Sequence, residues 1–278
     1  MEIRNALVLE RLLSIFLCHT GLLSLYMSLK RSRTVILTYH RIRPDEATGG
    51  GEAAILSKGN FERHISYLSK HYDIISLADF VRLAGSGKRP PRKSVVLTFD
   101  DGYKDNRTNA YPVLKRHDVP ATIFLISGRI GSEGFLSSKD IREMSGLVDF
   151  GAHTASHAIL ADVSLSEAKR EIEGSKHDLE KLLKKEVKLF SYPSGGSRDY
   201  NDVVKRLVRE AGFDCAVTTM NGDNGPDSDM FELRRIGMSH ENSFTVFRVK
   251  SSGMLNSMLR IMKGRMSVSV SGHVKAGK

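Results

Sequence analysis

Short apolar runs alternate with longer amphipathic stretches along most of this 278-residue chain. The short runs are rich in β-branched residues and are bounded by turn residues or charges, a pattern typical of buried strands. Seven of them are predicted to be strands, at residues 34–42, 95–99, 121–126, 148–152, 188–193, 214–219 and 232–238. Helical stretches separate most of these strands, and this alternation predicts an α/β fold with a parallel sheet. Seven such units in about 210 residues favour a barrel.

The stretches between the strands have the apolar spacing of amphipathic helices. Helices are predicted at residues 61–71, 77–84, 106–117, 138–144, 165–185 and 200–211. In the longest of them the apolar positions fall near one face, at Ala168, Ile172, Leu179, Leu182 and Leu183. We expect this face to be the buried one.

The N-terminal region, residues 1–33, is apolar and ends in a basic cluster. Residues 12–29 contain no formal charge, and Lys30, Arg31 and Arg33 follow. Eighteen such residues lie at the lower edge for a membrane span, and no small-x-small cleavage site precedes Lys30. We expect membrane association, either as a span or as an interfacial helix, and a helix packed on the domain is the alternative. In a spanning arrangement the basic cluster favours a cytoplasmic location for the following domain, with a periplasmic or extracellular location as the alternative.

The net charge of +10 is concentrated at the two ends of the chain. Residues 1–33 have a net charge of +3 and residues 242–278 one of +7, which leaves the remaining part neutral. Basic flanks around a neutral domain suit an anionic membrane surface better than nucleic acid, so we expect no nucleic-acid partner. Solvated tails are the alternative. We therefore divide the chain into an N-terminal helix (1–33), a catalytic domain (34–240) and a basic helical tail (241–278).

Within the tail, apolar residues recur at helical spacing and include several methionines. They are Met254, Leu255, Met258, Leu259 and Met262. Such a stripe is more typical of a helix that covers the core than of a membrane-binding face.

The candidate chemistry lies at the ends of two predicted strands. Asp100 and Asp101 follow the strand at 95–99, and His153 and His157 follow the strand at 148–152. Active sites of α/β folds gather at this edge of the sheet. An aspartate and two histidines can bind a divalent metal and leave positions open for water and substrate. A second carboxylate beside the metal is a suitable general base, so the pattern predicts a metal-dependent hydrolase.

Two motifs in this order, Thr98-Phe99-Asp100-Asp101-Gly102 and His153-Thr154-Ala155-Ser156-His157, resemble those of a known family. The family is the polysaccharide deacetylases of carbohydrate esterase family 4, the NodB-homology domain. The segment 190–195 lies where the third family motif would fall, and the resemblance covers about residues 34–240. It implies a distorted (β/α)7 barrel of the NodB-homology type. It also implies a hydrolase that removes N-acetyl groups from the amino sugars of a polysaccharide, an oligosaccharide or a lipid-linked glycan.

The resemblance assigns roles to the residues of the first two motifs. By position, Asp101, His153 and His157 would bind the metal. The metal is usually zinc in this family, with Co2+, Ni2+ or Mn2+ as alternatives. Asp100, the first aspartate of the pair, would be the general base for the attacking water.

The third motif departs from the family pattern. Ser191 stands where many members have an arginine directed at the catalytic aspartate. We expect Arg235 to supply this guanidinium from a later strand, with Arg234 as the alternative. The motif would also contribute substrate and oxyanion contacts, at Tyr192, Pro193 and Ser194.

A histidine at the end of the first strand is the candidate general acid. His40 in Thr38-Tyr39-His40 resembles the early Tyr-His of members whose acid histidine lies near the start of the domain. The late Leu-x-His motif of other members is not evident. The helical and loop histidines are expected on the surface, at His64, His71, His117 and His177.

Two other functions are compatible with these residues. The same metal site could remove an O-acetyl or a formyl group, because the metal ligands do not determine which acyl bond is cleaved. A glycan-binding protein without turnover is the other alternative, and the altered third motif allows it.

Overall fold

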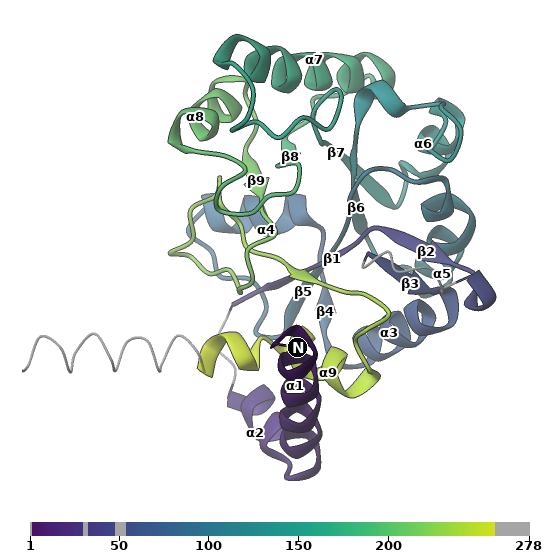
Figure 1. Cartoon of the computed structure of the whole chain (residues 1–278), viewed down its shortest axis with the longest axis vertical. Coiled ribbons are helices and arrows are strands. Elements are labelled where there is room, and N and C mark those ends of the chain that lie inside the picture. Colours follow the sequence, from purple (N-terminus) through teal and green to yellow (C-terminus); the bar gives the residue numbers. More distant parts are fainter. Residues whose placement is uncertain (1, 30–32, 48–53, 259–278) are drawn as a thin grey trace, which may run out of the picture.

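The computed structural model describes residues 2–29, 33–47 and 54–258, and it contains a curled parallel sheet surrounded by helices (Figure 1). Seven strands form a continuous path in the order β10-β1-β5-β6-β7-β8-β9, and every neighbouring pair is parallel. They are β1 (Val35–Tyr39), β5 (Ser94–Phe99), β6 (Ala121–Leu125), β7 (Val148–Ala152), β8 (Leu189–Ser191), β9 (Cys215–Val217) and β10 (Ile236–Gly237). These are the seven predicted strands, and the prediction of a distorted (β/α)7 barrel is confirmed.

Residues 233–237 join the two edges of the curled sheet. Leu233 forms a parallel bridge with Val217 at the end of β9. Three residues later, Ile236 of β10 pairs with Leu37 of β1. The segment between these pairings therefore crosses from one edge strand to the other, and it contains residue 235.

Two short strands were not predicted, and a third is the end of the strand predicted at 34–42. β4 (Asp73–Ile74) pairs with the start of β5, and β2 (Arg41–Arg43) pairs with β3 (Ile55–Ser57) in a separate two-stranded sheet. The predicted strand at 34–42 is divided at His40 into β1 and β2. Strands of two or three residues are too short to show an alternating pattern.

Most of the helices that connect the strands begin with a side-chain N-cap. Ser57, Ser76, Ser164 and Asn201 each accept a hydrogen bond from a first-turn amide, and Ser137 forms a capping box. The helices begin within five residues of the predicted starts. They are α3 (Lys58–His71), α4 (Leu77–Gly85), α5 (Tyr111–His117) after a π-helical turn at Asn106–Ala110, α6 (Ser138–Met144), α7 (Leu165–Leu183) and α8 (Asp202–Glu210), with 3-10 turns at Asp45–Ala47 and Ser127–Arg129.

Side chains alternate between the two faces of the curled sheet. Val95, Leu97 and Phe99 of β5 belong to the outer core between the sheet and the helices. The alternate residue Val96 belongs to an inner cluster that also contains Phe80 of α4. Since side chains on a strand alternate, Thr98 and Asp100 face inward with Val96. The interior is thus apolar near the start of β5 and polar near its end.

The predicted apolar face of α7 is confirmed. Ala168, Ile172 and Leu179 are fully buried, and Leu182 and Leu183 pack partly buried against the same core. The sheet therefore orients this helix through the positions that the periodicity indicated.

The two ends of the described chain pack on each other. α1 (Glu2–His19) and α2 (Leu22–Leu29) contact α9 (Phe244–Ser252) and the helical residues 254–258. Met254 is buried there, whereas Leu259 and Met262 of the predicted stripe lie outside the described residues. No single described helix is long and apolar enough to cross a membrane. Residues 7–19 of α1 together with α2, which are bent by 76° relative to each other, reach the length and composition of a span only as a pair. The division of the chain at residues 33 and 240 stays a prediction.

One histidine prediction was wrong. His64 of α3 is only 2% exposed and stacks on Phe247 of α9, with ring centroids 3.6 Å apart. Burial, assisted by the charge of Arg63, lowers the pKa of His64 to about 3. Because α9 covers this face of α3, a side chain that looks exposed on an isolated helix is enclosed.

Candidate active site

The predicted metal ligands meet at the carboxyl edge of the sheet. Asp101 follows β5, and His153 and His157 follow β7. Oδ1 of Asp101 lies 3.5 Å from Nε2 of His153 and 3.4 Å from Nε2 of His157. One ligand atom from each of the three residues lies within 4.8 Å of the other two. Residues more than fifty positions apart thus form one potential coordination site.

The backbone around these ligands is strained. Asp101, Thr154 and His157 have φ angles of 71°, 61° and 72°, in the left-handed region that non-glycine residues rarely adopt. Each costs roughly 1–3 kcal/mol, and such residues cluster at functional sites. Gly102 also has a positive φ, and a Cβ there would lie 2.5 Å from Cδ2 of Leu125. The backbone conformation therefore favours glycine at this position, and a side chain there would also displace the side chain of Leu125.

The chemistry of the three side chains fits a divalent cation. Oδ1 of Asp101 is buried and accepts no hydrogen bond from any of the described residues. Nδ1 of His153 donates to the carbonyl of Ser191 at 2.8 Å, which directs Nε2 toward Asp101. Burial lowers the pKa of His153 and favours the neutral ligand form, although Asp100 and Asp101 oppose this shift. One carboxylate and two imidazoles with open positions form a set typical of catalytic zinc.

Asp100 forms a buried ion pair with Arg235. The guanidinium donates two hydrogen bonds to the carboxylate, Nη1 to Oδ1 at 2.7 Å and Nη2 to Oδ2 at 2.6 Å. Asp100 is 2% exposed and Arg235 is fully buried. Burial alone would raise the pKa of Asp100, but the charge of Arg235, with smaller contributions from His153 and His40, lowers it well below its usual value. Asp100 is therefore ionised at neutral pH.

Residues at the ends of β8 and β9 hold the guanidinium of Arg235 in this orientation. Nε donates to the carbonyl of Thr218 at 2.8 Å, and Nη2 donates to Oγ of Ser191 at 3.1 Å. Ser191 stands where many family members have an arginine, and it contacts Arg235, which comes from a later segment of the chain. Nη1 also lies 3.3 Å from Oγ1 of Thr98.

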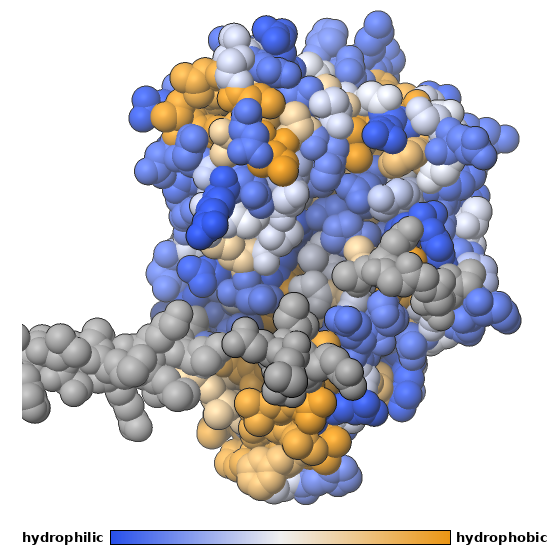
Figure 2. All heavy atoms as spheres, viewed as in Figure 1, coloured by the Kyte–Doolittle hydropathy of each residue, from blue (hydrophilic) through white to orange (hydrophobic). Residues whose placement is uncertain are grey.

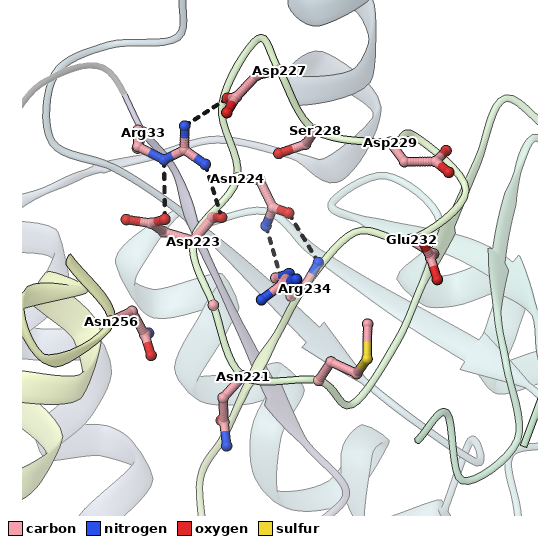
Figure 3. A pocket seen from close by; sticks show the side chains of 12 residues that line it. Arg33, Asn221, Asp223, Asn224, Asp227, Ser228, Asp229, Glu232, Arg234 and Asn256 are labelled. Carbon is pink, nitrogen blue, oxygen red and sulfur yellow. Dashed lines mark hydrogen bonds and ion pairs between the residues drawn. The ribbon is translucent and has the colours of Figure 1, made fainter. Parts of the chain in front are cut away.

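Arg234, the alternative partner for Asp100, lies elsewhere. Its side chain lines a separate pocket on the loop after β9 (Figure 3). The side chain of Asn224 forms two hydrogen bonds with the backbone of Arg234. It accepts one from the Arg234 amide at 2.9 Å and donates one to the Arg234 carbonyl at 2.8 Å. Neighbouring residues of an extended segment point to opposite sides, so only Arg235 reaches the interior.

His40 lies beside the Asp100 carboxylate. Its Nε2 is 3.9 Å from Oδ2 of Asp100, and its side chain is 28% exposed. The buried side chain of Asn106 donates to the carbonyl of His40 at 2.7 Å and so fixes the backbone at the break between β1 and β2. Asn106 could not be singled out along the chain, because its contact with His40 is tertiary.

The three third-motif residues lie in different environments, and their predicted role in substrate and oxyanion contacts stays a prediction. The hydroxyl of Tyr192 donates to the carbonyl of Phe231 at 3.1 Å, and its amide donates to the carbonyl of Val217 at 3.2 Å. Both donors of Tyr192 are thus used within the protein. Pro193 is buried and has no amide hydrogen. Ser194, exposed and with a φ of 57°, is the member of the three that can present its backbone to a ligand.

Glu171 of α7 holds the loop between the two histidines, and sequence reasoning missed it. Its Oε2 accepts hydrogen bonds from the amides of Ala155 and Ser156 at 2.9 and 2.8 Å. Its Oε1 accepts one from Oγ of Ser156 at 2.8 Å. These three bonds stabilise the strained turn that directs His157 toward Asp101. On the sequence, Glu171 is one of many acids on a charged helix.

Glu171→Ala is expected to lower zinc affinity by about tenfold, because partners that orient metal ligands typically contribute this much. Glu171→Gln should restore most of the affinity, since the amide oxygen can accept the two backbone bonds. Calorimetric zinc titration and the absorption spectrum of the cobalt-loaded protein would measure both effects. Glu173→Ala, two residues along the same helix, is the control, and wild-type affinity in Glu171→Ala would contradict the positioning role.

Comparison with known proteins agrees with this geometry. A family model described as polysaccharide deacetylase matches residues 87–216. The poly-β-1,6-N-acetyl-D-glucosamine N-deacetylase of Staphylococcus epidermidis is 31% identical over 245 residues, covering 79% of this chain and 83% of that protein. The structure of the Streptococcus pyogenes deacetylase PplD in complex with acetate is similar, with a TM-score of 0.72, 28% identity and coverage of 80% and 98%. A polysaccharide deacetylase from Bacillus cereus has a TM-score of 0.68, 28% identity and coverage of 79% and 68%.

Proposed function

The chain belongs to the polysaccharide deacetylase family, and from this premise we propose that it hydrolyses the N-acetyl amides of β-1,6-linked N-acetylglucosamine in a polymer or oligosaccharide. The similar proteins are named polysaccharide deacetylases, which are hydrolases that act on amide bonds. The choice of polymer is supported by the similarity to the Staphylococcus epidermidis enzyme. The reaction is supported above all by one observation, the convergence of the ligand atoms of Asp101, His153 and His157 at a site where the charge of Asp100 also acts on His153.

Asp101, His153 and His157 would hold a divalent cation, and this donor set suits zinc. When bound, such a cation supplies Lewis acidity, which lowers the pKa of water and polarises the acyl oxygen. Asp101 contributes the buried, unpartnered oxygen, and the bond from His153 to Ser191 keeps the imidazole in the required orientation. These residues therefore need little rearrangement to bind the ion.

Asp100 would accept the proton of the attacking water. Its two oxygens offer about four acceptor positions, of which Arg235 uses two, so the carboxylate can still accept a further hydrogen bond. Its lowered pKa means that the carboxylate is available as a proton acceptor at neutral pH. Arg235 keeps Asp100 ionised and in place, and acts as a positioning residue.

His40 would give a proton to the departing amine. It lies close to Asp100 yet remains partly exposed, so a substrate can reach its ring. A histidine is suited to this step because its pKa lies near neutrality. The backbone amide of Ser194 would stabilise the developing oxyanion, since hydrogen-bond donors at that point act most strongly in the transition state.

Acetate release tests the proposed reaction. The zinc-loaded protein should release acetate from β-1,6-linked N-acetylglucosamine oligomers, and a chelator should abolish the release. His153→Ala should bind no zinc at stoichiometric concentration and should be inactive, because it removes one of the three ligands. His177→Ala, on α7, is the matched control. Chelator-insensitive release would contradict the metal assignment, whereas release only from O-acetylated or formylated sugars would favour the alternative acyl group.

A further inference from the structure

The N-terminal helices expose a large apolar surface on the side away from the domain. Six side chains are between 56% and 67% exposed, and we call them the apolar face. They are Val8, Leu9, Leu12 and Phe16 of α1 and Leu25 and Leu29 of α2. Figure 2 shows this surface in orange at the lower end of the molecule, where Figure 1 places α1 and α2. Contiguous exposed patches of this kind mark interaction sites.

The opposite side of the same two helices is part of the folded domain. Leu17 of α1 and Leu23 of α2 are 2% and 3% exposed, in a cluster with Val249 of α9 and Met254. Both helices are therefore apolar on two sides, and packing against the domain accounts for only one of them.

Polar contacts also attach the helix pair to the domain. The hydroxyls of Tyr26 and Ser257 are 2.8 Å apart, and Nζ of Lys250 lies 3.4 Å from Oε1 of Glu10. Insertion of the whole pair across a bilayer would break these contacts and expose the buried cluster. The attachment and the 76° bend thus favour a pair that lies in the plane of an interface.

The charges next to the apolar face are positive. Glu10 is the only acid in residues 7–29, and Lys250 neutralises it. Arg11 is exposed on α1, and Lys30 and Arg31 follow α2 directly in the sequence. Residues 259–278, which continue from the helical segment packed against α1 and α2, contain five basic residues and no acid.

Arg33, the third residue of the basic cluster, is used within the protein. Its Nε lies 3.0 Å from Oδ1 of Asp223, and its Nη1 lies 2.6 Å from Oδ1 of Asp227 (Figure 3). These ion pairs fix the chain beside β1, at the point where it continues from the helix pair. The helices are therefore attached to the domain at both the α9 contact and Arg33.

We propose that the apolar face inserts into the headgroup region of an anionic lipid bilayer and holds the catalytic domain directly against the membrane surface. Apolar side chains supply the insertion, and neighbouring basic residues attract the anionic lipids. A second copy of the chain fits the apolar face less well, because dimerisation through this face would bring the basic residues beside it on each copy close together. The proposal does not depend on the deacetylase activity.

Vesicle binding by the full-length chain tests the proposal. We expect sedimentation with vesicles of equal parts phosphatidylglycerol and phosphatidylcholine, weaker sedimentation with phosphatidylcholine alone, and weakening by salt. Leu9→Ser, Leu12→Ser and Phe16→Ser combined should reduce binding by about tenfold or more. Leu165→Ser with Val203→Ser, which alters exposed apolar residues of α7 and α8, should bind as the wild type does.

Three results would overturn the proposal. The first is that the wild type does not bind the vesicles. The second is that the triple variant binds as well as the wild type although its circular dichroism is native. The third is that light scattering shows a dimer of the wild type and that the triple variant is monomeric. Extraction at alkaline pH separates the two membrane arrangements. Release of the bound protein supports the interfacial arrangement, and retention would contradict it in favour of a crossing pair.

Discussion

Asp100→Asn is expected to lower kcat by roughly 10²–10⁴-fold, the usual contribution of a general base. The amide cannot accept the proton of the attacking water, although it fills the same space. Zinc stoichiometry should remain at the wild-type value, because Asp101, His153 and His157 are unchanged. Acetate release under saturating substrate and metal analysis of the purified variant would measure the two quantities.

Loss of a buried charge could also lower activity through stability, and a double variant separates these effects. Asp100→Asn leaves the fully buried guanidinium of Arg235 without its counter-ion. Asp100→Asn combined with Arg235→Met removes both charges and should recover much of the stability without recovering turnover. Near-normal turnover in Asp100→Asn would contradict its assignment as the base.

Arg235→Met is expected to destabilise the protein by about 3–5 kcal/mol, the cost of leaving a buried charge unpaired. Denaturant unfolding would measure the free energy. Arg234→Met is the matched control, because the neighbouring arginine has similar chemistry but its side chain lies in the separate pocket of Figure 3. We expect Arg234→Met to change the stability by less than about 1 kcal/mol. Equal effects of the two variants would contradict the special role of Arg235.

The pH dependence of the Arg235→Met effect follows from the Asp100 carboxyl. Its pKa is lowered in the folded protein, whereas in an unfolded chain an aspartate has a pKa of about 3.9. The stabilisation by the ion pair is therefore complete above about pH 4 and is lost as the pH falls through the folded-state pKa. The stability difference between wild type and variant should shrink at acidic pH. In the variant the pKa of Asp100 rises, so the acid limb of the activity profile should move to higher pH.

Most of the fold could be predicted because its signals are local. The seven strands are short apolar runs with turn residues at their ends, and serine or asparagine caps begin most of the helices. The bend between α1 and α2 was not predicted. Gly21, with a φ of 75°, lies at the break, but one glycine in an apolar stretch does not indicate whether a helix continues or turns.

The two motifs of the site were also visible along the chain, since strand-end residues of a parallel sheet meet at one edge whatever the details of packing. The partners of those residues could not be predicted in the same way. Glu171, Asn106 and Ser191 contact the site through α7, the π-helical turn and β8, and each is a common residue type in an ordinary local pattern.

Local pattern was thus sufficient for the strands and for the two strand-end motifs, and the family resemblance assigned Asp101 and the two histidines to one metal site. The arginine beside Asp100 depended on how the sheet closes, because β10 joins β1 and turns residue 235 inward while residue 234 faces outward. The two partners are 135 positions apart. Packing between distant elements also explains why α9 buries His64 and why α1 is apolar on two sides. Contacts between distant elements are set by packing across the whole core, whereas periodicity describes one element at a time.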